Sequence, residues 1–236
     1  MTGATDASPD ATAAGPPVRD AATVILVRRP PEGPQVLMGQ RGTGAAFMPD
    51  KFVFPGGAVD AEDFAIAAEV PLAPETARRL SLDTDPDLAR ALPLAAVREL
   101  WEETGLMLGR PDPGAAARPV PPGWRGFYAA GLVPHTAALQ LVFRAVTPPG
   151  RPRRFDARFF LAESRDLAAE DLVPSGEELR HLAWLDLAAA RALPLPFITE
   201  VVLAELADML AVPDVDRDRP VPYFHHDARG SFFRLL

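Results

Sequence analysis

The sequence predicts a mixed α/β protein, and three observations support this prediction. Short runs rich in β-branched and aromatic residues recur along the chain, and segments rich in Pro, Gly and Arg bound them. Between these runs lie longer stretches rich in Ala, Leu and Glu, which are typical of helices. No internal repeat and no shift in composition divides the chain, so residues 20–236 are expected to form a single domain.

The first expected strands lie close together near the start of the chain. Residues 21–27 form a β-branched run, and residues 35–40 follow after a short Pro- and Gly-containing segment, so the two are predicted to pair as an antiparallel hairpin. Residues 52–54 form a third short strand, which Pro55-Gly56-Gly57 stops.

Two helical regions follow. Residues 63–93 have helical composition, and Pro71, Pro74 and Pro86 break it into pieces. Residues 94–104 then form one predicted helix that ends at Gly105, because glycine suits the left-handed position that follows many helices.

The second half of the chain repeats this mixture of elements. A surface loop is expected over the Pro-, Ala- and Gly-rich residues 111–122. Strands are predicted at residues 139–146, 157–162 and 181–185, an amphipathic helix at 195–210, and a terminal hairpin at 223–225 and 231–235.

Composition and charge exclude several classes of function. The 236 residues include no cysteine, which excludes thiolate nucleophiles and Cys-ligated zinc. The net charge of −8 argues against extended contact with nucleic acid. Residues 1–19 lack the pattern of a signal peptide and are expected to be a disordered tail. No run of apolar residues predicts a membrane span, so we expect a soluble cytoplasmic protein.

The segment 98–106 carries the strongest chemical signal. On a helix, residues three and four positions apart share a face, so Glu99, Glu102 and Glu103 point the same way, with Arg98 beside them. Three like charges on one face are unfavourable unless a cation lies between them, and Mg²⁺ or Mn²⁺ prefers carboxylate oxygens. Upstream, the turn at Gly56-Gly57 allows backbone to approach a ligand closely, as phosphate chemistry requires.

These residues resemble the box of the Nudix hydrolases, whose pattern is Gly, five residues, Glu, seven residues, Arg-Glu-aliphatic-x-Glu-Glu-x-Gly-aliphatic. The chain departs from it in two ways: Asp63 stands in place of the first Glu, and 34 residues (64–97) replace the usual seven. A split box of this kind resembles a subgroup related to the eukaryotic Nudix 19 proteins. The matching positions are Gly57, Arg98, Glu99, Leu100, Glu102, Glu103, Gly105 and Leu106, with further matching segments at 21–26, 47–49, 52–57, 153–160 and 195–199.

The resemblance implies an α/β/α sandwich with a mixed sheet, carrying a helical insertion at about 64–93. It implies that water attacks phosphorus in a nucleoside diphosphate linked to another group. Either Glu102 or the downstream Glu178 is expected to activate that water. The other implied roles are metal ligands at Glu99, Glu103, Glu102 and the carbonyl of Gly57, and orientation of a glutamate by Arg98.

Four arginines are candidates for substrate binding. Arg153, Arg154 and Arg158 surround a turn into a strand, where they either hold substrate phosphates and a base or form an ordinary surface cluster. Arg41 stands in a Gly-rich segment and either enters the active site or lies on the surface.

The predicted function is metal-dependent hydrolysis of a small nucleotide derivative. Coenzyme A, ADP-ribose, NADH and dinucleoside polyphosphates stay as alternative substrates. An RNA-end decapping hydrolase is a second enzymatic interpretation, and a catalytically silent domain that senses a nucleotide is a third, against which the complete glutamate set counts. The resemblance also implies a possible homodimer, and the insertion is a lid, an inert helix pair or a dimer contact.

Overall fold

A computed structural model describes residues 16–42, 44, 48–67, 69–168, 178–212, 219–227 and 230–236. Most of the expected tail, 1–19, therefore lies outside the described residues, and the first strand begins at Val18. In the described ranges, no helix is both long enough and apolar enough to cross a membrane.

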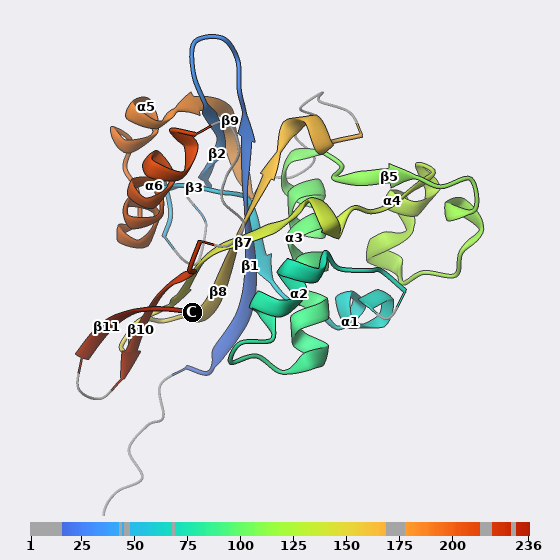
Figure 1. Cartoon of the computed structure of the whole chain (residues 1–236), viewed down its shortest axis with the longest axis horizontal. Coiled ribbons are helices and arrows are strands. Elements are labelled where there is room, and N and C mark those ends of the chain that lie inside the picture. The colour runs from blue at the N-terminus through green and yellow to red at the C-terminus, as the bar shows by residue number, and fades with distance from the viewer. Residues whose placement is uncertain are drawn as a thin grey trace, which may run out of the picture.

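A mixed sheet forms the centre of the molecule (Figure 1). Strand β1 runs parallel to β8 and antiparallel to both β2 and β4, which accounts for the mixed character. The order is β11-β10-β7-β8-β1-β2-β3, with β4 also on β1 and β9 on β2. The strands are β1 (Val18–Arg28), β2 (Gln35–Arg41), β3 (Phe52–Val53), β4 (Gly56–Ala58), β7 (Gln140–Val146), β8 (Arg154–Glu163), β9 (Leu179–Asp186), β10 (Pro222–Asp227) and β11 (Gly230–Leu235).

Helices cover both faces of this sheet (Figure 1). On one side lie α1 (Ala61–Ala67), α2 (Pro74–Leu80), α3 (Pro86–Thr104) and α4 (Arg125–Ala129); on the other lie α5 (Leu187–Arg191) and α6 (Phe197–Leu210). Near α4, β5 (Gly109–Pro111) and β6 (Leu132–Pro134) form a separate two-stranded ribbon. Four single turns of 3-10 helix complete the described elements: η1 (Ala115–Ala117), η2 (Pro122–Trp124), η3 (Thr136–Ala138) and η4 (Ser164–Asp166).

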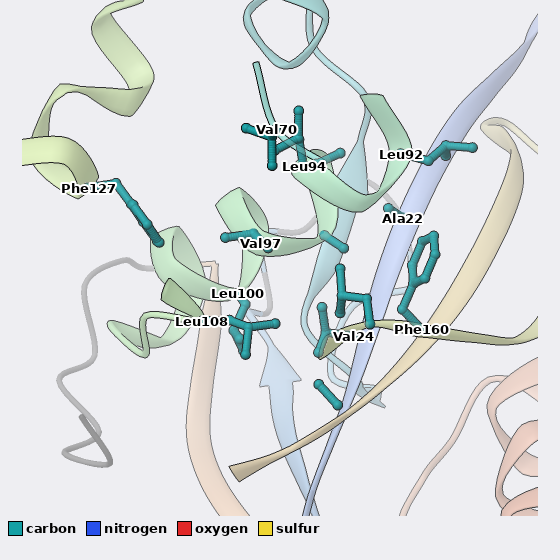
Figure 2. Packing of buried hydrophobic residues seen from close by; sticks show 14 of the residues in the cluster. Ala22, Val24, Val70, Leu92, Leu94, Val97, Leu100, Leu108, Phe127 and Phe160 are labelled. Atoms are coloured by element: carbon teal, nitrogen blue, oxygen red, sulfur yellow. The ribbon is translucent and has the colours of Figure 1, made fainter. Parts of the chain in front are cut away.

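The two hydrophobic cores follow from the alternation of side chains along β1. Ala22, Val24 and Leu26 are fully buried on the face that α3 covers, whereas Ile25 and Val27 are fully buried on the face toward α6. Figure 2 shows the first core, where side chains of α3 gather beside Ala22, Val24 and Phe160. A strand buried on both faces is expected to be continuously apolar, as residues 24–27 are.

Helix α3 carries the glutamates and is held at both ends. The Asp85 side chain accepts hydrogen bonds from the backbone N–H groups of Asp87 and Leu88, and Gly105 ends the helix with a φ of 78°. The predicted end at Gly105 is confirmed, but the predicted start at residue 94 is wrong, because the helix continues through Pro93 back to Pro86. Burial of Leu92, Leu94 and their neighbours outweighs the hydrogen bond that Pro93 does not make.

The other expected elements are present with small shifts of their ends. The first hairpin, the three strands of the second half, the helix near 195–210 and the terminal hairpin are all confirmed. The expected loop at 111–122 contains η1 and the start of η2. The ring of Trp101 packs edge-on against Phe127 of α4, with centroids 5.7 Å apart.

Residues 64–93, the expected insertion, contain most of α1, all of α2 and the first part of α3. They are joined to strand β7 and the residue before it by side chains of α2. Thr76 Oγ1 donates to the carbonyl of Leu139 at 2.7 Å, and Arg79 Nη1 donates to that of Leu141 at 3.3 Å.

Candidate active site

A cavity of about 760 Å³ opens on the α6 side of the sheet. One end of it is lined by Gly56 and Gly57 of β4, Glu99 of α3, Arg41 at the end of β2, and Glu178. These residues come from four separate parts of the chain. None of the described residues of the insertion lines this cavity, so its helices do not form a lid over it in this structure.

Arg98 organises the acidic residues around this end. Its side chain is 8% exposed, and its Nη1 donates to Glu99 Oε1 at 2.9 Å and to Glu102 Oε2 at 2.8 Å. Its Nη2 donates to the carbonyl of Ala58 at 3.0 Å. The predicted pairing of Arg98 with glutamates is thus present in the structure.

Asp63 is a site residue that sequence reasoning did not select. It is completely buried, and its two oxygens accept from Arg98 Nε at 3.0 Å and Nη2 at 3.1 Å. Asp63 Oδ2 also accepts from the backbone N–H of Asp60 at 2.9 Å. The signal that could have identified Asp63 was its position in the box, where the pattern has Glu. Although Asp is shorter than Glu, both of its carboxylate oxygens still reach Arg98.

Glu99 and Glu103 are two acids in an environment that disfavours their charge. The pKa of Glu103 is raised to about 8, by burial first and then by the neighbouring charge of Glu99, while the hydrogen bond that its Oε2 accepts from Gly56 N (2.8 Å) opposes the shift. Burial likewise raises the pKa of Glu99 to about 7, against the lowering effect of Arg98. The charge of Glu178 raises the pKa of both acids, which shows that this predicted residue lies near them.

The two glycines of β4 let the backbone approach these acids. A Cβ on Gly57 would overlap the carboxylate of Glu99, so that only glycine fits the present arrangement. A Cβ on Gly56 would lie 2.5 Å from the carbonyl oxygen of Ala22 in the neighbouring strand. Gly57 therefore lies directly against Glu99, and its carbonyl as a metal ligand stays a prediction.

The donor set at this end fits a hard divalent cation. Glu99 and Glu103 are buried carboxylates whose raised pKa values reflect too little positive charge around them, and a cation would supply it. Among the described residues, no group of three acidic or histidine side chains converges closely enough to hold a metal alone. Water or substrate oxygens would have to complete the coordination. Glu102 lies further out, with its side chain 42% exposed.

The candidate arginines are divided between the two faces of the sheet. Arg41 and Arg153 line the cavity, as do Arg19 and Arg151, which sequence reasoning did not select. Arg158 was proposed to bind substrate, but it is 2% exposed and pairs with Asp20 at 2.5 Å and Asp156 at 3.4 Å.

Arg154 is also absent from the cavity lining, and its Nε donates to the carbonyl of Thr147 at 3.2 Å. The expectation of substrate contact is corrected for Arg154 and Arg158. Alternation along β8 turns Phe155 toward the cavity face and leaves these two arginines on the opposite face.

Comparison with known proteins agrees with this geometry. A Nudix hydrolase structure from Alicyclobacillus acidocaldarius is 29% identical, with a TM-score of 0.63, over 84% of this chain and 93% of that one. In sequence, the chain is 29% identical to putative nudix hydrolase 7 of Caenorhabditis elegans over 80% of its own length. It is 31% identical to the acyl-coenzyme A diphosphatase NUDT19 of Gallus gallus over 61% of its length.

The chain is similar to Nudix hydrolases both in sequence and in fold. Its α/β sandwich is that of the Nudix fold, and its likeness to NUDT19 agrees with the split box. No protein-family model matches the chain. The chain spans 62% and 54% of the length of the two curated relatives.

Proposed function

We propose that this Nudix-like protein hydrolyses the diphosphate linkage of a nucleoside-diphosphate derivative with the help of Mg²⁺ or Mn²⁺. The observation that supports this most strongly is the cavity end where Glu99, Glu178 and the backbone of Gly56-Gly57 meet, with Glu103 buried directly behind them. The name of the Gallus gallus relative, an acyl-coenzyme A diphosphatase, places coenzyme A among the substrates to test.

The proposed roles follow from the contacts of each residue. Glu99, Glu103 and the Gly57 carbonyl would hold the cation, with Glu102 as an outer ligand, and the cation would neutralise the diphosphate. Arg98 keeps Glu99 and Glu102 oriented while Asp63 holds Arg98. The Gly56 N–H holds the Glu103 carboxylate in place.

We assign the proton-accepting role to Glu178. It lines the cavity, whereas Glu102 is outside the lining and already accepts from Arg98. Glu178 takes a proton from water while the water oxygen bonds to phosphorus. The bond between that phosphorus and the bridging oxygen breaks, so that each product carries one phosphate.

The test compares wild type with Glu103→Gln and Glu178→Gln. The panel contains coenzyme A, ADP-ribose, NADH, a dinucleoside polyphosphate and a capped RNA, each with and without added metal, and products are identified by mass. We expect metal-dependent turnover of at least one compound, with kcat reduced by roughly 100-fold or more in both variants. Turnover in ¹⁸O-water should place the label on a product phosphate.

Glu200→Gln is the matched control, because Glu200 is exposed on α6 and does not line the cavity. It should keep the wild-type rate. Wild-type rates in Glu103→Gln would contradict the role of Glu103, and a complete lack of metal-dependent turnover by wild type would contradict the proposed reaction.

A further inference from the structure

Three cavity arginines remain without a role in the proposed reaction. Arg19 precedes the buried part of β1, and Arg151 and Arg153 lie in the turn between β7 and β8. Arg19 pairs in register with Phe155, and Val18 pairs with Arg154, so the start of β1 and the turn adjoin each other. The three arginines therefore gather at one end of the cavity.

This arginine end (Arg19, Arg151 and Arg153) is distant from the carboxylates. Thr23 of β1 pairs with Gly56, beside Glu103, and Arg19 lies four residues earlier on the same face of the strand. Four residues of extended strand cover about 13 Å. A ligand whose diphosphate lies at the carboxylates, together with the cation of the proposed function, can therefore reach the arginine end only with a second, separate group.

The charges at the two ends differ in sign. Within the described part of the chain, the acids that line the cavity are Glu99 and Glu178, and both belong to the far end. Within the described residues, no ion pair involves Arg19, Arg151 or Arg153. On the opposite face of the sheet, by contrast, Arg144 pairs with Asp156 and Arg158 with Asp20. The arginine end is thus a positive surface for which no residue in the described ranges supplies a counter-charge.

The arginine turn is held at its base and bordered by the terminal hairpin. Thr147 N donates to the carbonyl of Phe155 at 2.8 Å, and Thr147 Oγ1 accepts from Phe155 N at 3.0 Å. His226 of β10 and Ser231 of β11, which are 2.8 Å apart from Nδ1 to Oγ, also line this cavity. The pKa of His226 lies below its ordinary value, because of burial first and then the positive charges of His225 and Arg154.

We propose that the arginine end is a second anion subsite, which binds a phosphomonoester that the substrate carries in addition to the scissile diphosphate. The inference rests on the proposed function and narrows its substrate class to phosphorylated nucleoside-diphosphate derivatives. The cavity wall also includes Phe155, Phe159 and Phe224, which suit the apolar or aromatic part of such a molecule.

The test uses coenzyme A and 3′-dephospho-coenzyme A, which differ by one phosphomonoester. Binding of each is measured by calorimetry without metal, so that the result does not depend on turnover, and kcat/KM with metal follows. The test variant is Arg151→Gln/Arg153→Gln. The matched control is Arg125→Gln/Arg165→Gln, which removes the same charge at exposed residues outside the cavity.

Wild type and the control should bind coenzyme A at least about tenfold more tightly than the dephosphorylated form, since charge-assisted hydrogen bonds to a phosphate contribute affinity of that order. The test variant should reduce this preference by about tenfold, mainly through KM where turnover is measured. Equal binding of the two ligands by wild type, or an unchanged preference in the test variant, would overturn the subsite. Preferential binding without any turnover would contradict the proposed function and leave the subsite supported.

Discussion

Arg98 joins segments that are distant in the sequence. Its guanidinium contacts Asp63, which lies 35 residues earlier, and the Ala58 carbonyl of β4. Burial lowers the pKa of Arg98, but its hydrogen bonds to Asp63 and the nearby acids outweigh this and hold the pKa above its ordinary value. Arg98 is therefore charged at every accessible pH, and the packing of its neighbours depends on that charge.

Arg98→Ala should destabilise the fold by about 3–5 kcal/mol, because it leaves the fully buried carboxylate of Asp63 without a counter-charge. Urea denaturation measures the loss. Arg165→Ala, at an exposed arginine, should change the free energy of unfolding by no more than about 0.5 kcal/mol. A loss for Arg98→Ala as small as this control would show that the network does not stabilise the fold.

Sequence reasoning located the acidic residues better than the arginines. Glu99, Glu103 and Gly57 follow from a local pattern, because helical spacing and a glycine turn constrain them directly. The arginines depend on which face of a strand each occupies, and a shift of one residue reverses that face. Arg158 was therefore misplaced, and Arg19 could be assigned to the cavity only after the pairing of β1 with β8 was known.

At the scale of elements, the short strand β4 connects the sheet to helix α3. It pairs with β1 through Gly56, Gly57 and Ala58, and one of its N–H groups donates to Glu103 of α3. The two glycines have different neighbours. Gly57 faces a side-chain carboxylate, whereas Gly56 faces the backbone of Ala22 and Thr23.

Alanine at these two positions should therefore have different effects. Gly57→Ala should displace the Glu99 carboxylate and reduce kcat by about 100-fold with little loss of stability, since displacements near 1 Å can cost this much. Gly56→Ala should reduce the free energy of unfolding by about 1–3 kcal/mol, because the backbone of β1 cannot yield as a side chain does. Parallel measurements of kcat and of urea denaturation distinguish the two; identical effects would contradict this difference.

Helix α3 illustrates where sequence reasoning fails at this scale. Its end was predictable because a glycine marks it, and its start was not, because Pro93 is an ordinary signal for a boundary. The helix continues past Pro93 because Ala91 and Leu92 before it are completely buried against the rest of the first core. That burial is a tertiary property, which local patterns do not report.

For the molecule as a whole, the buried acids link stability to pH. The folded-state pKa of Glu103 is about 8 and that of Glu99 about 7, both above the ordinary value of 4.5. Between the ordinary pKa of 4.5 and these raised pKa values, the folded protein binds more protons than the unfolded chain does. Its stability must therefore fall as the pH rises through this range.

Without metal, Tm should decrease between about pH 5 and pH 8, and the decrease should be smaller in Glu103→Gln, which cannot ionise at that position. Added Mg²⁺ or Mn²⁺ should raise the wild-type Tm most at pH 8, where the carboxylates are most ionised. Scanning calorimetry from pH 5 to 8, with chelator and with metal, measures both effects. The same pH dependence in wild type and variant would show that Glu103 is not the group responsible.

The Asp63–Arg98 pair also bears on where the sequence of this protein can accept insertions and deletions during evolution. The pair joins the two ends of the long excursion through α1, α2 and the start of α3, and the cavity takes no described residue from that excursion. Loop length adds little to the entropy of closure once the ends are fixed. The turn between α2 and α3, where Ser81 and Leu82 are exposed, is therefore a position where chain can be gained, lost or replaced by a whole inserted domain while the carboxylates stay in place. For protein engineering, it is the natural point at which to attach a sensor.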